Sequence, residues 1–139
     1  MQAQPSALPL NADPDVFINR PLNVAVAKLA ADIATCSARP SFLLAFDVCD
    51  SARSLFTAYL VEWALNGAVG YRQRVVELMQ RAQPVLERSL VNEQQTNGAN
   101  LSYLETYVAH NLQRIDVLEV LHTKGREAAE EVLLCGHHN

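Results

Sequence analysis

The sequence predicts an all-α fold: a single antiparallel helical bundle of four main helices, with a short fifth C-terminal helix and an extended N-terminal arm. Apolar residues recur at spacings of three and four over several long stretches, which is the pattern of amphipathic helices. No period-two run bounded by turn residues indicates a strand. A chain of 139 residues is long enough for one domain. We therefore assign residues 1–20 to the arm, which is rich in proline, and residues 21–139 to the bundle.

The central helix is expected over residues 42–65, where apolar side chains cover a broad side rather than a narrow stripe. Ser41 is a suitable N-cap and Asn66-Gly67 a suitable end. Such a wide apolar surface predicts contact with at least two neighbouring helices. Tyr59 and Trp63 are expected to be buried in it. The polar residues expected on its other side are Asp47, Asp50, Ser51, Ser54, Thr57 and Glu62.

The other helices are placed by the same periodicity and by their end signals. Arg39-Pro40 ends the first helix, and residues 92–100 form the clearest loop of the chain. Ser102 and Glu105 have the spacing of a capping box that opens the fourth helix. Residues 123–125 are expected to interrupt the helix, which resumes as the short last helix. The expected bounds of these helices are 21–38, 71–91, 102–122 and 127–135.

Composition and charge exclude several classes of function. The net charge is −4, and acidic and basic residues are spread along the chain, so nucleic acid is not expected as a partner. A membrane span over residues 42–65 is rejected, because several charged residues would have to enter hydrocarbon. The N-terminus has neither the basic start nor the apolar core of a signal peptide, and the three cysteines form an odd count. We therefore expect a reduced, cytoplasmic protein.

We recognise no catalytic, cofactor or metal motif, and a non-enzymatic protein without a cofactor is expected. A glycine-rich phosphate loop, a nucleophile elbow and a dinucleotide fingerprint are all missing. Cys135, His137 and His138 are possible zinc ligands, but they lack the spacing of a structural zinc site. Asn111 and His122, both placed on the inner arc of the fourth helix, are interpreted as a buried hydrogen-bonded pair that sets helix register.

The run His110-Asn111-Leu112-Gln113-Arg114 resembles the His-x-Leu-Lys-Gly run of histidine-phosphotransfer domains, which are four-helix bundles with an exposed phosphate-accepting histidine. The resemblance covers five residues and implies that His110 would carry the phosphoryl group. Gln113 stands where that family has lysine, and Arg114 where it has the small residue that lets a response regulator approach. Histidine phosphotransfer is therefore a remote alternative.

Protein binding is the favoured function, because three apolar features have no evident cover. They are a patch in the arm, the end of the fourth helix, which is apolar nearly all round, and the apolar C-terminal segment. Either the C-terminal helix or a second subunit covers the end of the fourth helix, and the sequence leaves both open. A twofold dimer is the default form of a shared patch. The candidate interface residues are Val16, Phe17, Ile18, Val117, Val120, Leu121, Leu133 and Leu134.

We therefore expect a protein-binding module that forms a homodimer and acts through helix-mediated contact with a protein partner. Small acidic helical bundles of this kind serve in bacteria and phages as antiactivators, adaptors and secretion chaperones, which is an analogy at the level of fold. The alternative is a bundle with an internal small-ligand or metal pocket, a class that includes enzymes.

Overall fold

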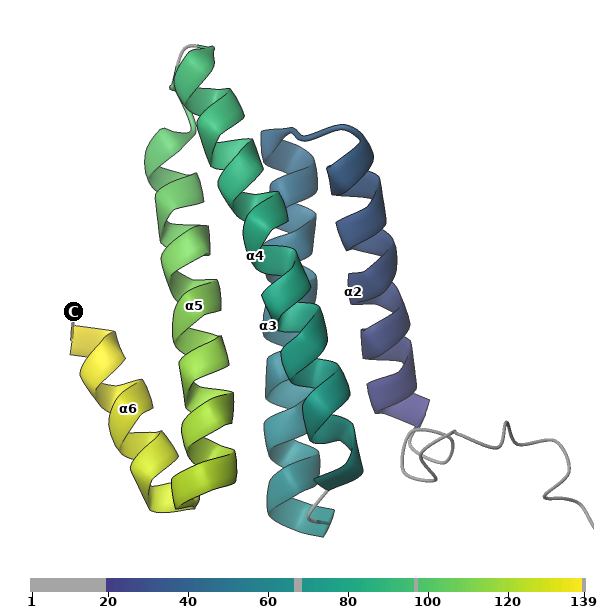
Figure 1. The fold of residues 1–139 in the computed structure, drawn as a ribbon, viewed down its shortest axis with the longest axis vertical. Coiled ribbons are helices and arrows are strands. Elements are labelled where there is room, and N and C mark those ends of the chain that lie inside the picture. The colour runs from purple at the N-terminus through teal and green to yellow at the C-terminus, as the bar shows by residue number, and fades with distance from the viewer. Residues whose placement is uncertain (1–19, 67–68, 97, 139) are drawn as a thin grey trace, which may run out of the picture.

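The computed structural model describes residues 20–66, 69–96 and 98–138, and this part of the chain is an all-α bundle without strands (Figure 1). The predicted fold class is confirmed. The predicted arm, with Val16, Phe17 and Ile18, lies outside the described residues. None of the described helices is both long and apolar enough to span a membrane. The elements are α2 (Arg20–Ala38), α3 (Phe42–Asn66), the short 3-10 helix η2 (Val69–Tyr71), α4 (Arg72–Gln95), α5 (Leu101–Lys124) and α6 (Arg126–His138).

Successive main helices run antiparallel, so α3 and α5 start at the same end of the bundle and run in the same direction (Figure 1). Helix α3 packs against α2, α4 and α5, which confirms the expectation that it contacts at least two neighbours. Helix α4 packs against α2, α3 and α5, so α3 and α4 share the central position. The shorter α6 turns back along α5. Because α3 and α5 lie side by side in parallel, their N-terminal residues meet at one end and their C-terminal residues at the other.

The start of α3 follows the predicted capping geometry. The backbone amide of Leu44 donates a hydrogen bond to Ser41 Oγ at 3.2 Å, so the hydroxyl satisfies one of the free amides of the first turn. The break between α5 and α6 is also confirmed. Gly125 has a φ of 91°, a conformation that side chains other than glycine rarely adopt, and α6 starts at the next residue.

The predicted capping box at Ser102 and Glu105 is wrong. Helix α5 starts one residue before Ser102, with Asn100 at the N-cap position and no side-chain cap. A residue of α4 replaces the box: the Glu93 carboxylate accepts a hydrogen bond from the backbone amide of Asn100 at 3.2 Å. Helix α4 extends to Gln95, beyond its predicted end, and therefore includes Glu93. The backbone amide at the start of α5 is therefore satisfied by a side chain of α4 rather than by a residue of α5 itself.

The core lies between α2, α3, α4 and α5, and the tertiary contacts change three expectations. Tyr59 is buried as predicted, but Trp63 is only half-buried, because it lies near the end of α3 beside a cleft. Ser51 is buried, not solvated, because its hydroxyl donates a hydrogen bond to the Asp32 carboxylate of α2. His122 is exposed in the last turn of α5, so it does not pair with Asn111. The largest fully buried side chains are Tyr59, Tyr71, Leu22, Leu29, Leu55, Met79, Leu86, Leu104, Leu118, Val48, Val75 and Val117.

Asn111 links α5 to α4 in the core. Its Nδ2 donates hydrogen bonds to the carbonyl oxygen of Met79 at 3.0 Å and to Gln83 Oε1 at 2.9 Å. Gln83 Nε2 in turn donates to Glu87 Oε2 at 3.0 Å, which carries the network to the surface of α4. Asn111 Oδ1 is buried without a hydrogen-bond partner. The expected buried polar contact at Asn111 is therefore present, and its partners belong to α4.

Candidate functional site

Four aromatic rings meet where α3 and α5 begin. Phe42 and Phe46 lie four residues apart on α3, and Tyr103 and Tyr107 four apart on α5, so each pair projects from one side of its helix. The ring centroids of Phe42 and Tyr107 are 6.1 Å apart and the rings are stacked at 22°. Phe46 meets Tyr107 at 5.9 Å and Phe42 meets Tyr103 at 6.1 Å, both in tilted arrangements. These are the separations at which aromatic pairs attract one another.

This cluster is partly open to solvent. Tyr103 is 59% exposed, Phe46 45% and Leu43, the residue after Phe42, 72%, while Phe42 and Tyr107 are half-buried. Desolvation by burial raises the pKa of the Tyr107 hydroxyl. We call this surface the aromatic face and define it by Phe42, Leu43, Phe46, Tyr103 and Tyr107. Single exposed apolar residues are common on soluble proteins, but a contiguous group of large ones indicates a contact surface.

Arg114 lies on α5 two turns beyond Tyr107 and contacts α3 beside the aromatic face. Its Nη1 donates a weak hydrogen bond to Cys49 Sγ at 3.9 Å, and the guanidinium belongs to none of the ion pairs between described residues. Burial raises the pKa of the Cys49 thiol, although Arg114 acts in the opposite direction. The thiol is therefore protonated near neutral pH and is not an activated nucleophile. Cys36 and Cys49 are both free and buried.

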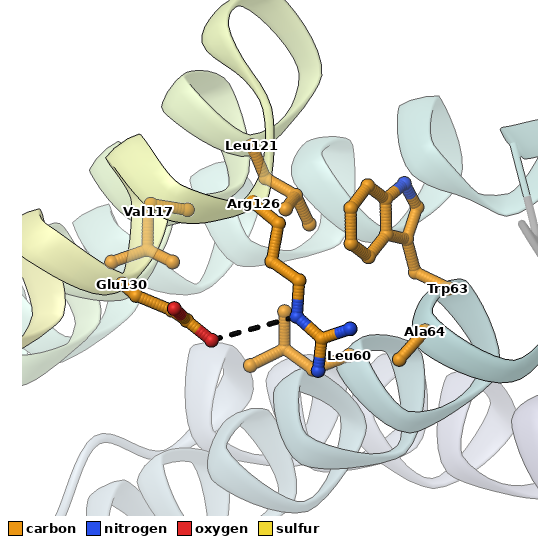
Figure 2. A pocket seen from close by; sticks show the side chains of 8 residues that line it. Leu60, Trp63, Ala64, Val117, Leu121, Arg126 and Glu130 are labelled. Atoms are coloured by element: carbon orange, nitrogen blue, oxygen red, sulfur yellow. Dashed lines mark ion pairs between the residues drawn. The ribbon is translucent and has the colours of Figure 1, made fainter.

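A cleft of about 170 Å³ lies at the opposite end of the α3–α5 contact, where α6 packs against α5 (Figure 2). Its walls are apolar except at the rim, where Arg126 Nε and Glu130 Oε2 form an ion pair at 3.5 Å. Both charged side chains are largely exposed, so the pair contributes at most about 1 kcal/mol to the free energy of unfolding. The lining residues are Leu60, Trp63, Ala64, Val117, Leu121, Arg126, Ala129 and Glu130.

The residues predicted to form an interface are placed differently from one another. Val117 is 1% exposed and Leu121 5%, so the chain itself covers both. Val120 is half-buried against the core, and Leu134, on α6, is 62% exposed. The side chain of Leu133, like Val16, Phe17 and Ile18, lies outside the described residues. Within the chain, α6 covers this end of α5 through Ala129 and Val132.

Sequence reasoning missed the aromatic face. The only local signal is the pair of Phe-x-x-x-Phe and Tyr-x-x-x-Tyr spacings at residues 42–46 and 103–107. Helical periodicity places Phe42 and Tyr107 on the apolar sides of two separate helices, and nothing in the sequence shows that these sides meet. The four rings form one surface only because α3 and α5 start at the same end of the bundle.

Among the described residues, no three histidine, cysteine or acidic side chains lie close enough together to hold a metal ion. The side chains of Cys135, His137 and His138 are not described. His110 is exposed on α5, one turn before Arg114. The chain matches no known family model, no characterised protein and no solved structure.

Proposed function

We propose that this chain is a non-enzymatic protein-binding module, a small regulator or adaptor that contacts another protein through the aromatic face. The observation that carries the proposal is the exposure of Leu43, Phe46 and Tyr103 where the rings of α3 and α5 pack against one another. Aromatic residues are enriched in protein interfaces, because they bury much apolar area with few rotatable bonds. Bacterial and phage antiactivators, adaptors and chaperones are the functional class that we propose, by analogy of fold.

The apolar surface that the aromatic face exposes is large enough to contribute a few kcal/mol to the free energy of binding. Full burial of a leucine or phenylalanine side chain contributes roughly 1.5–3 kcal/mol. Leu43 and Phe46 still expose 72% and 45% of their surfaces, so a partner that covered both would gain a few kcal/mol from these two side chains. Packing against Tyr107 already holds the Phe46 ring in place, which lowers the entropy lost on binding. This is the arrangement of an interface hot spot.

We also propose that the chain forms a homodimer in the cytoplasm. The default symmetry of small homo-oligomers and two separate exposed apolar positions, Leu43 on α3 and Leu134 on α6, support self-association. The free, buried Cys36 and Cys49 agree with a reducing compartment. A second copy and an unrelated protein are both possible occupants of the aromatic face, and the experiment below separates them.

The experiment measures light scattering and partner capture on matched variants of one helix. Leu43→Glu introduces a charge on the aromatic face, and Leu65→Glu introduces the same charge at a position that is 74% exposed at the other end of α3. We expect the Leu65→Glu protein to behave as the wild type. Leu43→Glu should lose the partner that the wild type captures from its native host, with an unchanged circular dichroism spectrum.

The dimer is tested by light scattering over a dilution series on the same proteins and on Leu134→Glu. A dimer that becomes a monomer only with Leu43→Glu places the subunit contact on the aromatic face, and one lost only with Leu134→Glu places it on α6. A wild-type monomer at all concentrations refutes the dimer and leaves the aromatic face to a different protein. Equal capture by Leu43→Glu and Leu65→Glu refutes the aromatic face as the binding surface.

A further inference from the structure

The cleft at the other end of the bundle has features that the proposed protein-binding function does not use. It lies between the C-terminal turns of α3 and α5 and the first turns of α6 (Figure 2), whereas the aromatic face lies at the N-terminal turns of α3 and α5. Trp63, Leu60 and Leu121 form much of its apolar wall. Trp63 is half-buried rather than enclosed in the core, and it lines the cleft.

The volume restricts what can enter. Pockets for drug-sized ligands and cofactors occupy roughly 300–1,000 Å³, whereas an apolar cavity of about 150 Å³ takes up a molecule the size of benzene. The cleft measures about 170 Å³ and therefore holds one ring or one short alkyl chain. A nucleotide or a flavin would place most of its surface outside the cleft.

The rim of this apolar cleft carries the ion pair of Arg126 and Glu130. Figure 2 shows the Arg126 side chain reaching from α6 towards Leu60 and Ala64 of α3, with Glu130 on the far side of the guanidinium from Trp63. The ion pair uses Arg126 Nε, at 3.5 Å, so it leaves the two terminal nitrogens for another acceptor. A guanidinium presents paired donors that match the two oxygens of a carboxylate.

We propose that the cleft binds a small amphiphilic carboxylate, whose single ring or short alkyl chain packs against Trp63 and Leu121 and whose carboxylate pairs with the terminal nitrogens of Arg126. Complementarity of charge at the rim and of size within the walls commits the site to this ligand class. An ammonium head group cannot accept hydrogen bonds from the terminal nitrogens of Arg126, and Glu130 is already paired with that side chain. A ligand without an apolar part would gain nothing from the walls and would be left with an exposed ion pair.

The test uses the full chain with sodium octanoate as the probe. Trp63 is the only tryptophan, so its fluorescence reports directly on the cleft. We expect a saturable change of emission with octanoate and a rise in Tm, because a ligand that binds only the native state stabilises it. Octylammonium should bind up to about fivefold more weakly, since it cannot accept hydrogen bonds from the Arg126 guanidinium. Acetate at equal ionic strength should leave the emission unchanged.

Variants locate the site. Arg126→Gln should weaken octanoate binding by up to about fivefold, because an exposed ion pair contributes at most about 1 kcal/mol, and should remove the preference over octylammonium. Ala64→Phe places a ring in the cleft from an exposed position and should abolish binding without loss of circular dichroism. Val61→Phe is the matched control, because Val61 is an exposed residue of α3 that does not line the cleft. It should bind octanoate as the wild type does.

Several outcomes overturn the proposal. It fails if octanoate causes neither an emission change nor a Tm shift, if octylammonium binds as tightly, or if Ala64→Phe binds as tightly as Val61→Phe. It also fails if octanoate does not bind and Trp63 emission changes on dilution of the protein alone, because a second copy then covers the cleft. None of these results bears on the aromatic face, which Leu43→Glu tests separately.

Discussion

The buried amide of Asn111 provides the sharpest test of how α4 and α5 are held together. Its Nδ2 donates to the Met79 carbonyl and to Gln83 Oε1, while its Oδ1 is buried without a partner. We consider Asn111→Leu, Gln83→Leu and the double variant. Leucine is close to both side chains in size, so the substitutions change hydrogen bonding more than volume.

The expected change in the free energy of unfolding follows from the hydrogen-bonding groups that each substitution leaves unpaired. Asn111→Leu removes two hydrogen bonds worth roughly 0.5–1.5 kcal/mol each and leaves buried Gln83 Oε1 without a donor, a cost of about 1–3 kcal/mol. The substitution also removes the buried, unpaired Oδ1 of Asn111, which returns a similar amount of free energy. The free energy of unfolding should therefore fall by about 1–3 kcal/mol. In the double variant both partners are apolar, and the net change should lie within about 1 kcal/mol of zero.

The assay is urea unfolding followed by circular dichroism and by Trp63 fluorescence, with coincident transitions as the check on two-state behaviour. The double-mutant cycle should show a coupling of roughly 1–3 kcal/mol between Asn111 and Gln83. If Asn111→Leu alone stabilised the protein by more than about 1 kcal/mol, the two hydrogen bonds would contribute less than the unpaired oxygen costs. That result, or additive effects of the two substitutions, would refute the reasoning.

Three further predictions concern a helix cap, a thiol and the core. Ser41→Ala should lower the free energy of unfolding by about 1 kcal/mol, because Ser41 caps α3. Ser102→Ala should change it by less than about 0.5 kcal/mol, because Ser102 caps no helix. Urea unfolding measures both, and equal effects would contradict the assigned caps. Because burial raises the pKa of the Cys49 thiol, the unfolded thiol ionises first, and stability should decline as pH rises above about 8.5. Cys49→Ala should show a shallower decline above about pH 8.5, and a parallel curve would argue against this assignment. Leu55→Ala should cost about 2–5 kcal/mol and Leu65→Ala less than about 0.5 kcal/mol in thermal or urea unfolding, because the first side chain is fully buried and the second exposed.

Local chemistry determined the helices, and that is why the sequence predicts them well. Helical periodicity, the Ser41 cap and the glycine at position 125 each act within a few residues, so their effects can be read from neighbours in the chain. The central position of residues 42–65 also follows from one helix, because a wide apolar surface requires more than one neighbour.

Tertiary structure decided everything that depends on which helices are adjacent. Glu93 of α4 displaced the local capping box at Ser102, and the parallel packing of α3 and α5 joined two separate aromatic pairs into one face. The burial of Val117 likewise depends on how the neighbouring helices pack against α5. The physical reason is that periodicity specifies which side of a helix is apolar, whereas the identity of the neighbour that covers it depends on the packing of the whole bundle.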